Sequence, residues 1–128
     1  MEENLPGIPV QAQQMQKVFF DLLYNGRHAL NRRYSGKDSN KKLLVSGTDI
    51  SEAAGRYLKF SFEDKGYGMD ADEVAKIFDS SYSAQKRRNG IRYGLAASRK
   101  IVENHGGSLE VKSIPGESTT VVLCFPLP

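Results

Sequence analysis

The sequence predicts an α/β fold in which helices are layered on a sheet as a sandwich. Three observations indicate this class. The predicted elements follow the order helix, two strands, two helices, two strands, which is typical of a mixed α/β sandwich. The strands come as two adjacent pairs, which suits antiparallel pairing. The chain of 128 residues is long enough for one domain with a core and short for two, so we expect a single domain over residues 1–128.

The first element is a long helix, expected from about Gln11 to Tyr34 and ending before Gly36. Apolar residues recur in it at helical spacing on two adjacent ridges, so one side of the helix should be buried. The ridges are formed by Val18, Leu22 and Ala29, and by Phe19, Leu23 and Leu30.

Two strands follow, over residues 41–47 and 55–64. In the second strand, Leu58, Phe60 and Phe62 alternate with Tyr57, Lys59, Ser61 and Glu63. This alternation is the period of a strand with one buried face. We therefore expect an antiparallel pair that covers the core on one side.

The middle of the chain is less regular. Residues 65–69, "KGYGM", break the strand pattern, and residues 70–78 should form a short helix with acidic residues at its start. Residues 80–94 show no period and are expected to be a mobile loop.

A second amphipathic helix should run from about Gly94 to Asn104, with "HGG" as its C-terminal stop. Its inward side chains are expected to be Leu95, Ser98, Ile101 and Val102. Two final strands, residues 108–114 and 119–125, flank the turn "PGES".

Composition excludes several classes of protein. The longest apolar run, "TVVLCFPLP", is far shorter than the ~20 residues of a membrane helix, so we expect no membrane contact. The N-terminus lacks the features of a secretory signal, and a cytoplasmic location follows as the default. Cys124 is the single cysteine and should be a small buried hydrophobe rather than a disulfide or metal residue.

The net charge of +3 comes mainly from three basic clusters, "GRHALNRR", "NKKLL" and "QKRRNGIR". A nucleic-acid-binding domain usually carries a larger excess with interleaved aromatic residues, so we expect no nucleic-acid partner. The third cluster adjoins a glycine-containing loop, where its cations can serve a bound phosphate. Solvated surface charge is the alternative for all three.

The first candidate motif is Asp21 with Asn25, four residues apart and therefore on one face of the first helix. Oxygen ligands of this kind suit Mg²⁺, which takes one or two protein oxygens together with waters and substrate phosphates. The alternative is that Asp21 faces water and Asn25 bonds to backbone.

The second motif places Asp64 at a strand end, followed by Gly66 and Gly68. The glycines allow a sharp turn and close approach of a flat ligand, while the carboxylate can accept a hydrogen bond from an exocyclic amine such as that of adenine. A calcium loop would need more carboxylates. A plain glycine turn between strand and helix is the alternative.

The third motif, "NGIRYGLAASRKIVENHGG", runs from Asn89 to Gly107 and places Gly94 at a helix start, where backbone N–H groups can bind an anion. It is neither a Walker A loop nor a dinucleotide fingerprint, because it lacks the G-K-[ST] ending and a preceding strand. An ordinary loop and helix cap remains the alternative.

In this order and spacing, the three motifs resemble the ATP-binding domain of sensor histidine kinases. That family lies within the superfamily of type II topoisomerases, mismatch-repair ATPases and large heat-shock chaperones. The resemblance covers nearly the whole chain. It implies a Bergerat-type fold: a two-layer α/β sandwich, with a mixed, mostly antiparallel sheet, about three helices on one face, and nucleotide held between helices and a lid.

The resemblance also implies ATP and Mg²⁺ as cofactors and gives roles to individual residues. Asn25 corresponds to the residue that holds Mg²⁺, and Asp64 to the one that reads adenine. The other residues implied in nucleotide binding are Gly66 and Gly68 of the adenine motif, Phe78 and Tyr82 beside the lid, Lys86 and Arg87 as cations, and Gly90, Arg92, Gly94 and Leu95 of the phosphate loop.

Arg92 departs from the family pattern, because it stands where the middle glycine of G-x-G-x-G-L is usual. It can pair with a phosphate, as a forked and always charged donor, or it can fill the site and weaken nucleotide binding. We predict retained binding, because Asp64 and Asn25 are intact and basic residues 86–88 still supply positive charge.

Asp21 stands where kinases usually carry Asn. A matching Glu activates water in the ATPase branches, so Asp21 can in principle act as a general base. We predict instead a catalytic role as an indirect ligand that orients a Mg²⁺-bound water, because Asp is one methylene shorter than Glu.

No phospho-acceptor histidine is recognisable, since neither His28 nor His105 has the expected setting. We therefore expect an excised or split catalytic domain. Its expected partners are a histidine-containing dimerisation domain and a downstream response regulator, and the isolated domain is expected to be monomeric. Two other functions stay open: a degenerate, non-catalytic interaction module, and an anti-sigma-type serine kinase.

Overall fold

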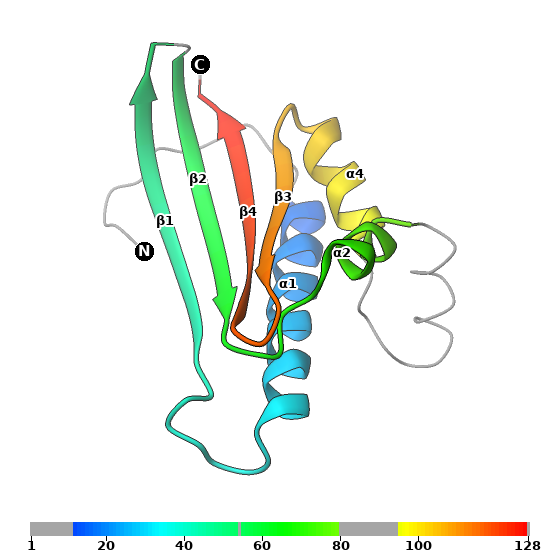
Figure 1. The fold of residues 1–128 in the computed structure, drawn as a ribbon. Coiled ribbons are helices and arrows are strands. Elements are labelled where there is room, and N and C mark those ends of the chain that lie inside the picture. Colours follow the sequence, from blue (N-terminus) through cyan, green and yellow to red (C-terminus); the bar gives the residue numbers. More distant parts are fainter. Residues whose placement is uncertain (1–11, 54, 80–94, 128) are drawn as a thin grey trace.

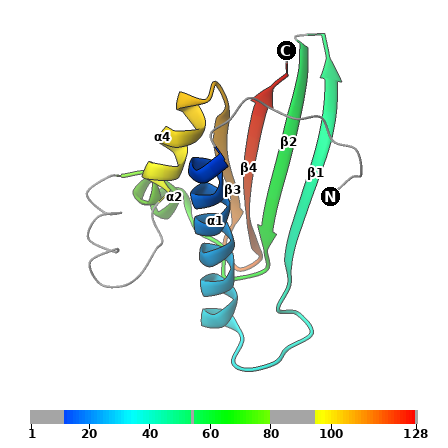
Figure 2. The same cartoon turned by 180° about the vertical axis from the view of Figure 1, so that it is seen from behind.

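A computed structural model of the chain describes residues 12–53, 55–79 and 95–127. Four strands form one sheet, and the helices lie on one side of it (Figures 1 and 2). The elements, in chain order, are α1 (Ala12–Arg33), β1 (Leu43–Glu52), β2 (Gly55–Asp64), α2 (Ala71–Ile77), α4 (Ala96–Asn104), β3 (Ser108–Ile114) and β4 (Ser118–Pro126). The predicted two-layer α/β sandwich is confirmed.

The strands are ordered β1-β2-β4-β3, and each neighbouring pair is antiparallel. A parallel pair, which a mixed sheet would add, is not seen among the described strands. The register places Asp64, the last residue of β2, opposite Leu43 on one side and Thr119 on the other. The end of β2 therefore lies in the middle of the sheet rather than at an edge.

Strand β2 has the bounds that the sequence predicts, because its alternating apolar side chains point to the helices. Strand β1 continues to Glu52, five residues beyond the predicted end at Gly47. The extension includes Thr48 and Ile50, whose β-branched side chains favour an extended backbone, and it pairs with the first half of β2.

The core lies between the sheet and helices α1 and α4. Phe19 of α1 meets the rings of Phe60 and Phe62 edge to face, with centroids 5.3 and 5.4 Å apart, a favoured aromatic geometry. The buried apolar side chains of this cluster are Met15, Val18, Leu22, Leu58, Phe60, Phe62, Ile77, Leu95, Val102, Leu109, Val121, Leu123 and Phe125.

Leu23 departs from the predicted apolar ridge, since 40% of it is exposed. The buried stripe of α1 is centred on Val18 and Leu22. Leu23 lies about 100° further around the helix than Leu22, which takes it past the edge of the contact with the sheet. Leu30 is buried as predicted.

Local capping interactions define the start of α2 and the end of α4. Asp70 caps α2, and Glu73 completes a capping box by accepting from the Asp70 N–H. Helix α4 begins at Ala96 rather than at Gly94, and it ends at "HGG" as predicted. There Gly106 has φ +78° and the N–H of Gly107 donates to Val102 O over 3.0 Å, which is the Schellman arrangement.

The last pair of strands agrees closely with the prediction, with β3 ending at Ile114 and β4 beginning at Ser118. None of the described helices has the length and apolar character needed to cross a membrane. The predicted loop at residues 80–94 lies outside the described residues.

Candidate functional site

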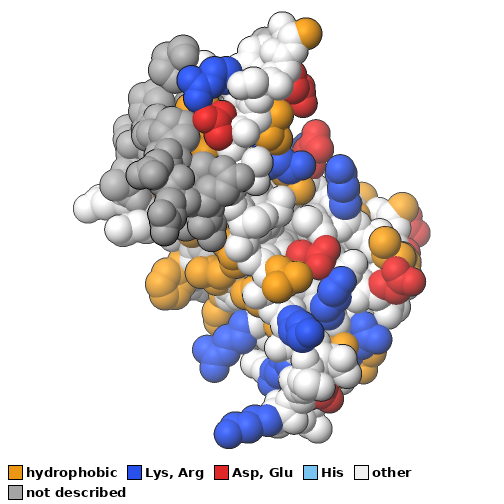
Figure 3. Space-filling model, turned by 90° about the vertical axis from the view of Figure 1, so that its left-hand side faces the viewer, with side chains coloured by type: hydrophobic (Ala, Val, Ile, Leu, Met, Phe, Trp, Pro, Cys, Tyr) orange, Lys and Arg blue, Asp and Glu red, His pale blue; other side chains and the backbone are white. Residues whose placement is uncertain are grey.

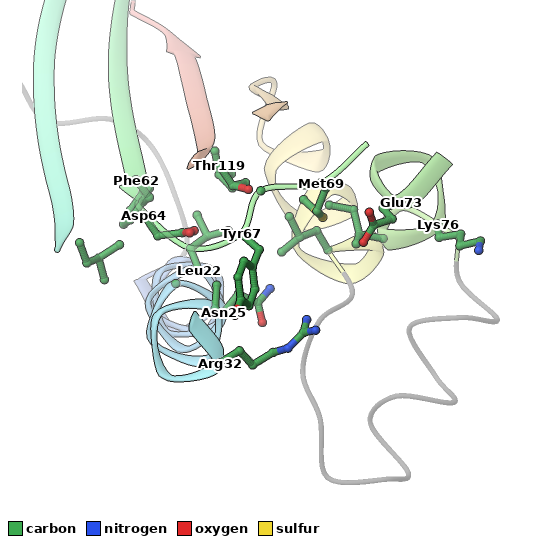
Figure 4. Close-up of a pocket in the computed structure, with 17 residues that line it drawn as sticks. Leu22, Asn25, Arg32, Phe62, Asp64, Tyr67, Met69, Glu73, Lys76 and Thr119 are labelled. Carbon is green, nitrogen blue, oxygen red and sulfur yellow. The ribbon is translucent and has the colours of Figure 1, made fainter. Parts of the chain in front are cut away.

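A cavity of about 510 Å³ opens between α1, the end of β2, the segment after it and α2 (Figure 4). Its walls combine apolar side chains with a few polar ones, as in small-molecule sites. It is lined by Leu22, Asn25, Gly26, Ala29, Arg32, Leu43, Phe62, Asp64, Tyr67, Gly68, Met69, Glu73, Lys76, Ile77, Leu95, Thr119 and Val121.

Asp64 is the buried carboxylate of this cavity, with 8% of its surface exposed. The Gly66 N–H donates to its Oδ1 over 3.0 Å. Burial raises the pKa of Asp64 from 3.8 to about 6; the hydrogen bond from Gly66 acts in the opposite direction, and the neighbouring Glu63 carboxylate adds to the rise. An ionised carboxylate in this position is an acceptor only, which suits a ligand that presents an N–H group.

The two glycines after Asp64 are both required by space. A Cβ on Gly66 would lie 2.9 Å from the Cβ of Ala29 on α1. Gly68 has φ +70°, and a Cβ there would collide with the Ile114 carbonyl. Gly68 lines the cavity itself, whereas Gly66 holds the segment against α1. The predicted glycine turn is therefore tightly packed between α1 and the β3–β4 turn.

Asn25 projects from α1 into the cavity, which Tyr67 also lines (Figure 4). Asp21, one turn earlier, is only 4% exposed and is not among the lining residues. Its Oδ2 accepts hydrogen bonds from Lys17 Nζ over 3.3 Å and from Ser98 Oγ over 3.4 Å. The alternative in which Asp21 faces water is thus wrong, while its catalytic role remains a prediction.

Phe78 and Leu95 lie before and after residues 80–94, which are outside the described part of the chain. Phe78 is the C-cap of α2, and the guanidinium of Arg99 lies 4.3 Å from the centre of its ring. Leu95 is buried, lines the cavity and donates its N–H to Ile77 O over 2.8 Å. Phe78 is not among the lining residues.

Six predicted binding residues lie outside the described part of the chain, so their roles stay predictions. They are Tyr82, Lys86, Arg87, Gly90, Arg92 and Gly94.

The cavity has further lining residues that the three sequence motifs do not include. Arg32 lies seven residues after Asn25, two turns further on the same face of α1, so helical spacing gave a signal for it. Tyr67 lies inside the Asp64 motif itself. Thr119 is brought to the cavity only by the pairing of β4 with β2, and no local pattern marks it.

Metal-binding chemistry at this cavity rests on few protein ligands. Within the described ranges, no group of three or more His, Cys, Asp or Glu side chains is placed to hold a metal ion. The amide oxygen of Asn25, which lines the cavity, is a ligand that suits Mg²⁺ better than zinc, because Mg²⁺ prefers oxygen and binds mainly through waters and substrate phosphates.

Residues 11–128 match the model of the family described as histidine kinase-, DNA gyrase B-, and HSP90-like ATPase. The chain therefore belongs to this family, and the resemblance inferred from the three motifs is confirmed.

Curated relatives point to one branch of the family. The methanogenesis regulatory histidine kinase FilI of Methanothrix harundinacea is 29% identical over 100% of this chain and 13% of its own length. The sensor histidine kinase ZraS of Escherichia coli K12 is 29% identical over 98% of the chain and 24% of its length. The signal transduction histidine-protein kinase AtoS of the same strain is 27% identical over 99% and 19%. Together with the family match, these relatives support a kinase ATP-binding domain.

Proposed function

We propose that this domain binds Mg·ATP in the cavity and is the catalytic part of a two-component sensor histidine kinase. It would transfer the γ-phosphoryl group to a histidine on a separate dimerisation domain. The observation that carries the proposal is Asp64, a buried carboxylate on the wall of a 510 Å³ cavity, followed by a glycine segment with no room for a Cβ. The chain spans between 13% and 24% of the length of each relative named above.

The residues of the cavity fit an adenine base. Asp64 supplies an acceptor for the exocyclic amine, and its burial makes that hydrogen bond costly to leave unmade. Apolar side chains on the walls of the same cavity offer contact surface for the flat ring. They include Leu22, Phe62, Met69, Ile77 and Leu95.

The polar residues of the same cavity fit the phosphate end of the nucleotide. Asn25 would hold Mg²⁺ through its amide oxygen, and the ion would neutralise phosphate charge when bound. Arg32 and Lys76 also line the cavity and contribute cations, to which we add Lys86, Arg87 and Arg92 from the sequence. Catalysis by such a site consists of positioning and charge neutralisation.

The partners of this activity would be the dimerisation domain that carries the acceptor histidine and a downstream response regulator, in a cytoplasmic, phosphorelay setting. The isolated domain would be monomeric and would not bind nucleic acid. Figure 3 shows basic and acidic side chains on one face of the molecule, and the basic cluster of residues 85–92 lies outside the described residues.

The alternative is a degenerate, non-catalytic histidine kinase-like module with impaired nucleotide binding. Arg92 in place of the middle glycine favours it. Calorimetric titration of the domain with Mg·ATP separates the two. We expect a dissociation constant in the micromolar to millimolar range, which corresponds to a favourable binding free energy of roughly 4 to 8 kcal/mol. No saturable heat at millimolar nucleotide would favour the module.

A further inference from the structure

Arg33, the last residue of α1, reaches the backbone of the segment that follows Asp64. Its Nη1 donates to the carbonyl oxygens of Gly66 over 2.7 Å and Lys65 over 3.2 Å. A longer contact of 3.5 Å reaches Glu117 O in the β3–β4 turn. Because Nη1 carries two hydrogens, the two shorter bonds are the ones it can satisfy fully.

Tyr34 strengthens the same attachment. Its hydroxyl donates to Lys65 O over 3.1 Å, so this carbonyl accepts from two side chains. The guanidinium of Arg33 also lies 5.4 Å from the ring centre of Tyr34 and 5.7 Å from that of Tyr67. Tyr67 lines the cavity, so Arg33 lies against a side chain of the cavity wall and also contacts the backbone of the segment that precedes it.

The other half of the segment, residues 67–69, is held by the end of β3 and by the β3–β4 turn. Gly116 N donates to Tyr67 O over 2.5 Å, and Met69 N donates to Ser113 Oγ over 2.7 Å. The part nearest Asp64 is therefore held from α1, and the part nearest α2 is held from the sheet.

One peptide unit connects Arg33 to Asp64. The Lys65 carbonyl and the Gly66 N–H belong to the same peptide group, which is planar. Its oxygen accepts from Arg33 and Tyr34, and its N–H donates to Asp64 Oδ1 over 3.0 Å. Fixing the oxygen therefore fixes the direction of the N–H, and hydrogen bonds linked in this way polarise one another.

We propose that Arg33 is a positioning residue for purine recognition. It acts through the Lys65–Gly66 peptide, which orients the Asp64 carboxylate toward an adenine amine. This inference rests on the proposed function. The guanidinium of Arg33 is suited to holding this peptide, because a planar and always charged group fixes two carbonyl oxygens in one geometry. The ammonium group of a lysine does this less well.

The test compares Arg33→Met, Arg33→Lys and Tyr34→Phe with the parent chain. Arg56→Met is the matched control, because Arg56 lies at the opposite end of β2 and pairs with Asp49 over 2.7 Å. Binding of ADP and GDP is measured by calorimetry, exchange of the Gly66 amide hydrogen by NMR, and unfolding free energy by urea titration.

We expect Arg33→Met to lower the affinity for ADP about tenfold, which is the effect of one lost charged hydrogen bond. The affinity for GDP should fall less. The Gly66 amide should exchange about tenfold faster, while the amide of Leu123 in the core keeps its rate. Arg33→Lys and Tyr34→Phe should show smaller changes of the same sign, and Arg56→Met none.

Unchanged Gly66 exchange and an unchanged ratio of ADP to GDP affinity in Arg33→Met would overturn the proposal. So would an equal loss for both nucleotides, which indicates a merely structural role. Should the parent bind neither nucleotide, the proposed function fails, and the Gly66 exchange rate still decides whether Arg33 orders this peptide. If Arg33→Met does not fold, Arg33→Lys and Tyr34→Phe decide by the same two measurements.

Discussion

The Gly66 N–H donates to the Asp64 carboxylate over 3.0 Å, at a point where the strand ends and the chain turns under α1. This bond satisfies one acceptor of a carboxylate that is otherwise removed from water. The remaining oxygen sites of Asp64 are the ones that a ligand in the cavity can use. Asp64 therefore combines a fixed orientation with an unusually high pKa of about 6.

Replacing Asp64 by Asn should weaken adenine nucleotides more than guanine nucleotides. An amide can turn a donor toward the exocyclic amine of adenine, where the carboxylate presents acceptors only. The expected loss is ~1 to 3 kcal/mol, the cost of a polar group left unpaired in a closed site. Calorimetry with ADP and GDP measures it.

A suitable control is Asp49→Asn, because Asp49 pairs with Arg56 far from the cavity. It should leave both affinities unchanged. Equal binding of adenine nucleotides by Asp64→Asn and the parent would show that Asp64 does not read the base.

Asp64 should also make folding stability depend on pH. Its pKa is raised from 3.8 to about 6. Between about pH 4 and pH 6 the folded state therefore holds a proton that the unfolded chain has released. The contribution of Asp64 to stability is therefore full below about pH 4 and is lost as the pH rises through 6. A pKa difference of this size between the folded and unfolded states corresponds to roughly 3 kcal/mol in the free energy of unfolding.

The Asp64→Asn variant isolates this effect because it cannot ionise. Its stability relative to the parent should grow between about pH 4 and pH 7 and then level off. Urea denaturation at several pH values measures the difference. A difference that stays constant over this range would mean that Asp64 titrates near its ordinary value.

Much of the fold could be predicted because its signals are local. The alternation in β2 and the capping residues of α2 and α4 each act within a few residues. Leu23 was misplaced because the width of the buried stripe on α1 depends on how the helix sits on the sheet. The extra length of β1 likewise depends on pairing with β2.

In the candidate site, too, the residues in local motifs could be predicted, and those that depend on tertiary contacts could not. Asn25, Asp64, Gly68 and Leu95 were found from motifs, and all four line the cavity. Thr119 and the contacts of Arg33 were missed, because they join segments more than 30 residues apart along the chain. Such contacts follow from strand order and helix packing, which no single stretch of sequence encodes.

Gly68→Ala should destabilise the domain strongly, and Gly116→Ala only mildly. Both glycines have positive φ, +70° and +80°, so both variants carry the cost of a left-handed alanine, about 1 to 2 kcal/mol. A Cβ at Gly116 meets open space, whereas at Gly68 it would collide with the Ile114 carbonyl.

That carbonyl belongs to the end of β3 and cannot move without disturbing the hairpin, so we expect an extra cost of ~2 kcal/mol or more for Gly68→Ala. Urea denaturation of the two variants gives the comparison. Equal destabilisation would mean that the turn yields easily and that the close packing at Gly68 carries little energy.

Asn25→Ala should remove the dependence of ATP binding on Mg²⁺. If the amide oxygen holds the ion, the parent binds ATP more tightly with Mg²⁺ than with a chelator, and the variant binds equally in both. Adenosine, which lacks phosphates, should bind parent and variant alike. Retention of the full Mg²⁺ effect in the variant would assign the ion to other ligands.

Arg92→Gly tests whether the altered glycine loop keeps the site active. If Arg92 occupies phosphate space, glycine should tighten ATP binding and leave adenosine unchanged. If Arg92 pairs with a phosphate, glycine removes a charge-assisted hydrogen bond of ~1.5 to 3 kcal/mol and weakens ATP. We expect weakening, with a deficit that grows from ADP to ATP and shrinks at high salt, as it should for an exposed ion pair. A tighter ATP complex in the glycine variant would instead identify Arg92 as the residue that impairs the site.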